Sequence, residues 1–259
     1  MLAASHLTLR IGRRRILDDV DFEARAGAVT AIVGPNGSGK TTLLRALTGE
    51  GAAEGRITLN GIDIAAARPA RLAAVRAVLP QATPLAFPFL VAEVVRLGQR
   101  AGLSAADPGL AERALSAVGL QGLAARPYQE LSGGEQQRVQ LARVLAQVWQ
   151  PVGPEGPHWL FLDEPVASLD IAHQLQVMRL ARGYADAGGG VVAVMHDLNL
   201  TAMFADRVAL LAGGRVLAAG RVSEVLTDTH LSQAYGCALR VGVLPAQGPY
   251  ILPQAAGAA

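Results

Sequence analysis

The sequence predicts an α/β fold with a mainly parallel β-sheet covered by helices on both faces. Three apolar runs, Val29–Val33, Trp159–Leu162 and Val191–Met195, are typical of strands that are buried on both faces. Segments with the apolar spacing of helices alternate with these runs, as they do when helices connect parallel strands. A glycine-rich loop, GPNGSGKT, follows the first run directly and leads into a helical pattern. With 259 residues, we expect one compact unit that carries a smaller inserted lobe.

The part of the chain before residue 82 is expected to consist mainly of short strands. Turn residues such as Gly12 and Gly27 separate its apolar runs. Thr41–Thr48 has a helical pattern that ends before Gly49, and Asn60–Gly61 is typical of a tight hairpin turn. The strands expected here, besides Val29–Val33, are His6–Ile11, Ile16–Leu17, Val20–Ala24 and Arg56–Leu59.

Residues 82–130 differ in character, and we expect them to form a helical lobe inserted into the α/β body. Prolines interrupt this stretch, and the apolar spacing of helices appears between them. The helices expected in this lobe are Val91–Gln99, Gly109–Val118 and Ala124–Gln129.

The second half again alternates helices with strands and shows no internal repeat, so we expect one cassette. Pro151–Pro157 is expected to be a loop, and the last residues, QAAGAA, are expected to fray. The helices expected here are Ser132–Trp149, Ile171–Ala187 and Val222–Thr227. The additional strands expected near the end are Val208–Leu211 and Arg215–Ala219.

The composition excludes several classes of protein. The net charge is +2 and the basic residues are scattered apart from Arg13–Arg15, so the clustered basic face of a nucleic-acid-binding protein is missing. No apolar run reaches the roughly 18 residues of a membrane span, and the N-terminus lacks a signal-peptide pattern. We therefore expect a cytosolic chain that contacts a membrane only through a partner. The single cysteine, Cys237, excludes an internal disulfide and a cysteine-rich zinc site, and we expect it to be buried.

The loop at residues 34–41 fits the pattern G-x4-G-K-[ST] of a phosphate-binding loop. Its glycines let backbone N–H groups turn toward a polyphosphate, and the following helix adds its positive N-terminal end. Lys40 is the only lysine among the 23 basic residues; we expect it to reach the β- and γ-phosphates, and Thr41 to bind Mg²⁺. The predicted nucleotide-binding residues are Gly34, Pro35, Asn36, Gly37, Ser38, Gly39, Lys40, Thr41 and Thr42.

Two carboxylates follow the apolar run Trp159–Leu162. A buried strand would hold Asp163 at the edge of the sheet beside the phosphate loop, within reach of a magnesium ion. Glu164, one residue further, is placed to act as the general base that activates water, a role worth about 10²–10⁴-fold in rate. Alone, the pattern also fits a strand that ends in a solvated acidic turn, but the phosphate loop upstream favours the catalytic interpretation.

The segment LSGGEQQR, residues 131–138, resembles the signature of ABC ATPases. Ser132, Gly133 and Gly134 open a helix N-terminus, which makes the segment a second anion site. The resemblance implies an α/β fold with a RecA-like P-loop NTPase core, an antiparallel β subdomain and an inserted helical subdomain. It also implies a homodimer, in which the signature of one subunit closes over the γ-phosphate of ATP that the other subunit holds with Mg²⁺.

Other positions resemble further ABC ATPase motifs in the family's order. Gln81 matches the Q-loop glutamine, Asp170 ends the D-loop segment ASLD, and His196 matches the switch histidine. The catalytic residues that the resemblance implies are Glu164, His196 and Gln81. The magnesium ligands that it implies are Thr41, Gln81 and Asp163, and Asp170 joins the nucleotide-binding set with Ser132, Gly133 and Gly134 of the signature.

Two positions depart from the pattern of that family. An aromatic residue usually stands near position 11 to stack on adenine, whereas this chain has Arg10 and Ile11, and we expect one of these to pack on the ring. Glu135 stands where glutamine is commoner in the signature. The resemblance gives a cassette at residues 1–235, with 82–130 as its helical subdomain, and a C-terminal extension at 236–259.

Longer runs resemble the haemin-import ATP-binding proteins of Gram-negative bacteria, among them LPQATPLAFPF, LDEPVASLDIAHQ and HDLNLTAMFADRVALLAGGRV. This resemblance implies an ATP hydrolase that energises haemin uptake and sits peripherally on the cytoplasmic face of the bacterial inner membrane. The implied partners are two transmembrane permease subunits and a periplasmic haemin-binding protein that acts on the permease, with no nucleic acid. Pro84–Phe89 is a candidate segment for docking the permease, or part of the core of the lobe.

Two other functions stay open at this point. The same motor would serve iron–siderophore or cobalamin import, because nothing in the chain's own chemistry selects haem. A soluble ABC ATPase of DNA repair or cluster biogenesis is the alternative from another class. The coiled coils and zinc cysteines of DNA-repair members do not occur between the phosphate loop and the signature.

Overall fold

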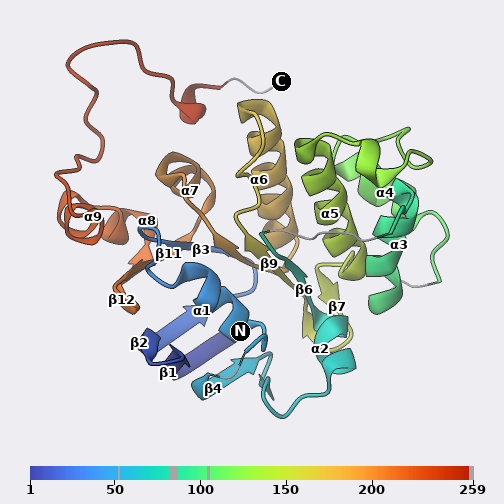
Figure 1. Ribbon diagram of the computed structural model, residues 1–259, viewed down its shortest axis with the longest axis horizontal. Coiled ribbons are helices and arrows are strands. Elements are labelled where there is room, and N and C mark those ends of the chain that lie inside the picture. The colour runs from blue at the N-terminus through green and yellow to red at the C-terminus, as the bar shows by residue number, and fades with distance from the viewer. Residues whose placement is uncertain (52, 82–86, 104–105, 257–259) are drawn as a thin grey trace.

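A computed structural model describes residues 1–51, 53–81, 87–103 and 106–256 of the chain. Its centre is a six-stranded sheet in the order β12-β11-β3-β10-β9-β6 (Figure 1). All neighbouring pairs in this sheet are parallel except β11 and β12, so the predicted parallel α/β sheet is confirmed. The strands are β3 (Val29–Val33), β6 (Arg76–Leu79), β9 (Trp159–Asp163), β10 (Gly190–Val194), β11 (Arg207–Ala212) and β12 (Arg215–Arg221).

The three central strands are buried on both faces, as their apolar runs predict. All residues of β3, β9 and β10 are buried. Alternate side chains enter two separate cores, because successive residues of a strand point to opposite faces. On β9, Leu160 and Leu162 pack into the core under α5 and α6, whereas Trp159 and Phe161 pack into the core around α1. Packing on both faces of β9 thus fixes the end of this strand, where Asp163 lies and Glu164 follows.

A second, antiparallel sheet has the order β2-β1-β4-β5 and shares the α1 core. The prediction of two short strands at Ile16–Leu17 and Val20–Ala24 was wrong, because one strand runs through both. Asp18 and Asp19 interrupt the apolar pattern at a β-bulge, where Asp19 has φ +53° and its N–H donates to Thr8 Oγ1. The strands are β1 (Leu2–Ile11), β2 (Arg14–Ala24), β4 (Glu54–Leu59) and β5 (Ile62–Asp63).

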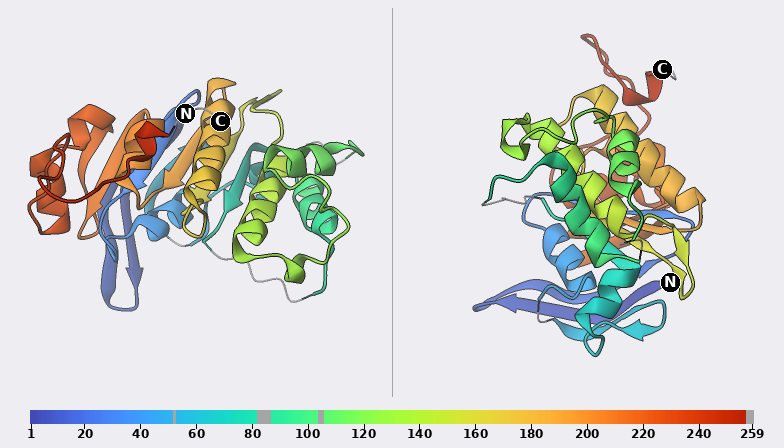
Figure 2. Two further views of the ribbon diagram at one scale, coloured as in Figure 1. Left: turned by 90° about the horizontal axis from the view of Figure 1, so that it is seen from above. Right: turned by 90° about the vertical axis from the view of Figure 1, so that its right-hand side faces the viewer.

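The helices cover both faces of the central sheet. Figure 2 shows the green helical lobe on one side of this sheet and the blue antiparallel sheet on another. The helices of the body are α1 (Lys40–Leu47), α2 (Pro69–Val75), α5 (Gly133–Gln147), α6 (Ile171–Asp186), α7 (Leu198–Phe204), α8 (Val222–Val225) and α9 (Asp228–Tyr235). Among these, α2, α7 and α9 were not expected, and the strand β6 was not expected either.

The helical lobe contains α3 (Val91–Ala101) and α4 (Leu110–Ala117), which pack on α5. The third expected helix, Ala124–Gln129, was wrong. That stretch instead caps the start of α3, since the carbonyls of Ala124 and Arg126 accept hydrogen bonds from the first two N–H groups of α3. Pro127 pairs with Leu90 as an isolated β-bridge, and only a short 3₁₀ turn, Tyr128–Glu130, follows.

Other details also differ from expectation. The expected loop at 151–157 forms a small hairpin of β7 (Val152–Gly153) and β8 (Gly156–Pro157), and Cys237 is exposed rather than buried. After α9 the chain makes a wide excursion and returns as a 3₁₀ turn, Pro253–Ala255, in contact with α7 (Figure 1). The expected fraying at the end includes residues 257–259, which lie outside the described residues. Within the described ranges, no helix is both long and apolar enough to cross a membrane.

Candidate nucleotide-hydrolysing site

The phosphate loop joins the end of β3 to the start of α1. Three of its glycines have positive φ: Gly34 at 147°, Gly37 at 77° and Gly39 at 103°. A Cβ on Gly34 would lie 2.1 Å from the carbonyl oxygen of Leu211, so no other residue fits there, whereas a Cβ on Gly37 would meet open space. The loop therefore passes close to the neighbouring strand on one side and leaves its other side free for a ligand.

Lys40 holds the loop together from inside. Its Nζ donates to the carbonyl oxygens of Gly34 at 2.9 Å and Pro35 at 3.1 Å, and only 6% of the residue is exposed. Burial lowers the pKa of Lys40, while the nearby charges of Glu164 and Asp163 act in the opposite direction. An arriving phosphate would supply the anion that this buried ammonium favours.

Ser38 carries an unused polar atom at the same place. Its Oγ is buried and has no hydrogen-bond partner among the described residues. Buried hydroxyls of this kind are rare without a partner, because leaving one unpaired costs about 1–3 kcal/mol. Together with the open side of the glycine loop, this hydroxyl fits the binding of a polyphosphate.

A cavity of about 300 Å³ lies over the loop. The loop and α1 contribute most of its wall, and Glu164 and His196 close one side. The lining in the described part of the chain includes Arg14 and Ile16, and it includes neither Arg10 nor Ile11. The expected adenine-packing pair thus lies at the end of β1, while the start of β2 reaches the cavity. From the predicted loop residues, the lining contains Asn36, Gly37, Gly39, Lys40, Thr41 and Thr42.

Thr41 and Asp163 meet beside the loop. Thr41 Oγ1 donates to Asp163 Oδ1 at 3.1 Å, although the two residues are 122 positions apart in the chain. Asp163 is the last residue of β9 and is 2% exposed. Its pKa is raised chiefly by burial, and the Thr41 hydrogen bond opposes this effect. A hydroxyl and a carboxylate next to a phosphate site are the oxygen donors that Mg²⁺ takes, so these residues fit that ion.

The three expected catalytic residues lie together at the carboxyl ends of neighbouring strands. Glu164 follows β9, Gln81 follows β6, and His196 follows β10. Gln81 Nε2 donates to Glu164 Oε2 at 3.1 Å, and His196 Nε2 lies 2.6 Å from Glu164 Oε1. The side chain of Glu164 is 14% exposed and borders the cavity. This arrangement holds one carboxylate between two neighbouring side chains at the border of the cavity over the phosphate loop.

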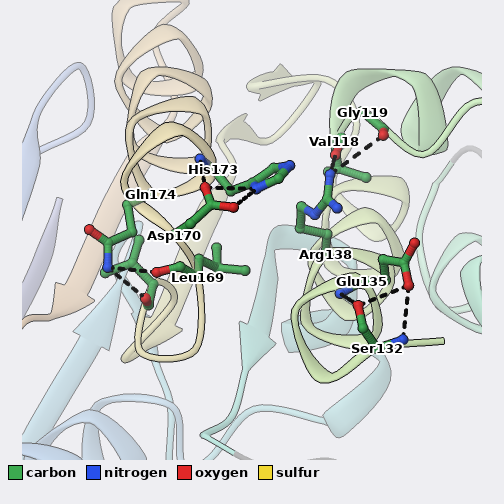
Figure 3. Close-up of polar contacts among 10 residues, drawn as sticks. Val118, Gly119, Ser132, Glu135, Arg138, Leu169, Asp170, His173 and Gln174 are labelled. Carbon is green, nitrogen blue, oxygen red and sulfur yellow. Dashed lines mark hydrogen bonds and ion pairs between the residues drawn. The ribbon is translucent and has the colours of Figure 1, made fainter. Parts of the chain in front are cut away.

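The signature residues lie at the N-terminus of α5, away from this cavity. Ser132, Gly133 and Gly134 are not in its lining. Ser132 caps the helix: its N–H and its Oγ both donate to Glu135 Oε2 at 2.8 Å, and Oγ accepts from the Glu135 N–H (Figure 3). The hydrogen bond from the Ser132 N–H lowers the pKa of Glu135. Within one chain, the signature thus faces no nucleotide held by its own phosphate loop.

The D-loop packs against the signature of the same chain. Asp170 caps α6 by accepting from the His173 N–H at 3.0 Å, and it pairs with His173 Nδ1 at 2.8 Å (Figure 3). The backbone hydrogen bond from His173 is the main cause that lowers the pKa of Asp170. A Cβ on Gly134 would lie 3.3 Å from Leu169 Cδ2, so the two segments are in close contact.

A family profile described as "ABC transporter" matches residues 17–167, more than half of the chain. The chain belongs to the ABC transporter family. The hemin import ATP-binding protein HmuV of Roseobacter denitrificans is 62% identical over 98% of both chains. The protein of the same name from Jannaschia sp. is 60% identical over 99% of this chain and 95% of the relative.

Solved structures of ABC transporter cassettes have the same fold. A nucleotide-free ATP-binding cassette from an ABC transporter is 25% identical, with a TM-score of 0.77 over 91% of this chain and 98% of that one. A dimeric ATP-binding cassette with bound ADP and phosphate is 27% identical, with a TM-score of 0.74 over 86% of this chain and 99% of that one. The expected α/β fold of an ABC ATPase is therefore confirmed.

Sequence reasoning missed three residues of this ABC transporter site. Arg14 and Ile16 line the cavity because β2 folds back over the phosphate loop, and only the folded hairpin reveals this. Gln137, inside the signature segment, donates from Nε2 to the main-chain oxygen of Glu164 at 3.2 Å. Its place in the motif was visible in the sequence, but its partner was not.

Proposed function

We propose that this chain is the ATP-hydrolysing subunit of a haemin importer, working as a homodimer with two permease subunits. The observation that carries the hydrolytic part is the contact of Gln81 and His196 with Glu164 beside the Lys40 loop. The identity of 52–62% to hemin import ATP-binding proteins across almost the whole chain supports the cargo. The proposed working unit is the cassette of residues 1–235, with 82–130 as its helical subdomain and 236–259 as an extension.

The proposed chemistry divides the work among residues already in place. Lys40 offsets the negative charge of the β- and γ-phosphates of ATP. Glu164 accepts the proton of the attacking water, so that the new bond to phosphorus forms as the bond to ADP breaks. Gln81 and His196 hold the two oxygens of Glu164 in position for that step. Thr41 and Asp163, with Gln81, would hold Mg²⁺, which supplies positive charge to the phosphates when bound.

The proposed dimer completes each site with the signature of the other chain. Ser132, Gly133 and Gly134 form a helix N-terminus suited to an anion, and none of them lines the cavity of their own chain. A head-to-tail pair would place each signature over the nucleotide of its partner and leave Asp170 near the seam. The resemblance to a dimeric cassette that holds ADP and phosphate supports this arrangement.

The permease is proposed to dock at a larger cavity of about 640 Å³ at the C-terminal end of α1. The end of α1, β4, α2 and α5 line it, and Arg76 and Arg143 bring positive charge to it. The Nε of Arg76 is buried without a hydrogen-bond partner among the described residues, and burial lowers its pKa. A permease loop that brings an acceptor oxygen would satisfy this atom. Phe87, 68% exposed, belongs to the candidate docking segment, whose residues 84–86 lie outside the described part.

The decisive experiment is ATP-driven uptake into proteoliposomes that contain the chain with its permease. Haemin, cobalamin and a ferric siderophore are compared, with the binding protein of the system outside the vesicles and the ATPase subunit and ATP inside the lumen. Uptake of haemin alone, lost in Glu164→Gln, supports the proposal. Uptake of another cargo would keep the motor and remove the haemin assignment. ATP hydrolysis without any uptake, in a chain that does not float with permease-containing membranes, would favour a soluble assembly.

A matched pair of variants tests the docking cavity. Arg76→Ala should lower uptake while the ATPase rate of the detached chain stays within about twofold, since Arg76 is remote from the hydrolytic residues. Arg71→Ala is the control, because Arg71 lies near the same cavity on α2 and is exposed in an ion pair with Glu155. Equal loss in both variants would count against a specific contact. The same assay tests the expected location on the cytoplasmic face, since only ATP enclosed in the lumen, on the side opposite the binding protein, would drive uptake.

A further inference from the structure

The turn after β9 carries the catalytic carboxylate in a backbone conformation that needs support. Glu164 has φ +52°, in the left-handed region that residues with a Cβ adopt rarely and at a cost. Its N–H donates to the carbonyl oxygen of Val194 at 3.2 Å. Its own carbonyl oxygen accepts two hydrogen bonds, from the Ala167 N–H at 3.3 Å and from Gln137 Nε2 at 3.2 Å. Both peptide groups of Glu164 are thus fixed.

One of these contacts comes from α5, the helix that follows the signature serine, and none of the roles described above links this helix to Glu164. Gln137 lies in the second turn of α5, which begins directly after Ser132 of the signature. Further along the turn, Gln174 Nε2 of α6 donates to the carbonyl oxygen of Leu169 at 3.0 Å (Figure 3) and to that of Val166 at 3.3 Å. Gln137 therefore joins the signature helix to the residue that positions the attacking water.

We propose that Gln137 is a positioning residue for hydrolysis, which holds the backbone of Glu164 so that its carboxylate faces the phosphate cavity. The inference rests on the proposed function of Glu164. In a head-to-tail dimer, the signature of each chain contacts the nucleotide of its partner. Gln137 then connects the two ATP sites: the position of α5, set by one nucleotide, controls the carboxylate that acts on the other.

A positioning role differs from a structural one in what it changes. Without the Gln137 donor, Glu164 can leave the left-handed conformation and its carboxylate turns from the cavity, while Lys40, Thr41 and Asp163 keep their contacts. The variant should therefore bind ATP normally and hydrolyse it slowly. A merely structural role would lower thermal stability and raise KM together with any fall in kcat.

Steady-state ATPase assays of Gln137→Ala and Gln140→Ala test this prediction. Gln140 is the control, because it lies on the same helix beyond the signature segment, and its Nε2 donates to Tyr128 Oη in the lobe at 3.1 Å. Gln137→Ala should lower kcat about tenfold, which corresponds to roughly 1.4 kcal/mol of transition-state free energy, with KM unchanged. Gln140→Ala should keep kcat within about twofold. Equal kcat values for the two variants would overturn the proposal.

Two further measurements separate the failure of this inference from the failure of the proposed function. Added to Glu164→Gln, the Gln137→Ala change should leave the ATP-dependent dimer in size-exclusion chromatography unaffected. Gln137→Glu replaces the donor by an acceptor, so its kcat should be as low as that of Gln137→Ala at pH 8. The ratio of its kcat to that of wild type should rise as the pH falls, because the new carboxyl gains a proton and can then donate a hydrogen bond. A flat ratio across pH would contradict a hydrogen-bonding role, whereas an inactive wild type would remove the proposed function itself.

Discussion

Replacing Asp163 by Asn should stabilise the nucleotide-free protein and remove most of its response to magnesium. Asp163 is 2% exposed, and burial raises the pKa of its carboxyl above the ordinary value of 3.8. The folded state therefore holds the proton more tightly than the unfolded state. Stability falls as the pH rises through the interval between the two pKa values, so at pH 7.5, well above 3.8, the protein carries a cost for the buried charge.

The size of the effect follows from the burial. A polar group buried with incomplete compensation costs about 1–3 kcal/mol in mutational data, and each kcal/mol shifts Tm by about 2–4 °C in a chain of this size. Asp163→Asn should thus raise the Tm of the nucleotide-free protein by at least about 2 °C at pH 7.5. The hydrogen bond from Thr41 survives, because an amide oxygen accepts it as well. The difference should shrink as the pH falls through the interval between the folded and the unfolded pKa of Asp163, and it should vanish below the ordinary value of 3.8.

The same substitution should weaken the stabilisation that ATP and magnesium give to the folded protein. With hydrolysis blocked by Glu164→Gln, ATP and magnesium at about 100 times Kd stabilise the folded state by about 2.7 kcal/mol, or about 5–11 °C in Tm. Asp163 is the carboxylate beside Thr41, and magnesium relies on one or two carboxylates with the phosphates. In the double variant Asp163→Asn/Glu164→Gln, the difference in Tm between samples with magnesium and samples with EDTA should fall below half of its value in Glu164→Gln alone.

Differential scanning fluorimetry at several pH values, with and without magnesium, measures both effects. A lower Tm of nucleotide-free Asp163→Asn at pH 7.5 would refute the argument from burial. A magnesium response of unchanged size would refute the ligand assignment while leaving the burial argument intact.

Three other substitutions have definite expected outcomes. Gly98→Ala should lower stability by about 1–3 kcal/mol in urea unfolding, since its Cβ would lie 1.9 Å from a main-chain oxygen of α5 and force the lobe helices apart. Trp159→Phe should cost about 2 kcal/mol in the same assay, because it opens a cavity and removes the indole hydrogen bond to Asn60 Oδ1 at 3.0 Å. Arg14→Ala should raise KM for ATP about threefold or more, by loss of cation–π or charge contact, and exceed the effect of Ile11→Ala, which lies outside the cavity lining. The reverse order would restore the expectation drawn from the sequence.

The features that the sequence predicts well are local. The phosphate loop needs glycines at fixed spacing, and the buried strands need uninterrupted apolar runs, so both appear directly in the chain. The contact of Glu164 with His196 also follows, because both residues follow predicted strands of one parallel sheet, and the carboxyl ends of such strands meet at one edge. Gln81 was placed there by the family resemblance alone, since its strand β6 was not expected.

The features that sequence patterns miss depend on tertiary contacts. The strand β2 continues through two aspartates because a bulge accommodates them and Asp18 pairs with Arg215 at the start of β12. The stretch 124–129 caps α3 instead of forming a helix, since two of its carbonyl oxygens accept hydrogen bonds from the first N–H groups of α3. The buried His158 shows the same limit: no local pattern indicates that its Nδ1 lies 2.6 Å from the carbonyl oxygen of Gln150.

The capping carboxylate of Glu135 changes what the signature can attract. A helix N-terminus capped by a neutral side chain draws any small anion toward its free N–H groups. Here the helix already carries a negative charge of its own at that end, and the pKa of Glu135 lies below its ordinary value. Free phosphate gains little by approaching it. A phosphate whose charge is partly balanced by a bound cation would therefore meet less repulsion at this helix end than free phosphate would.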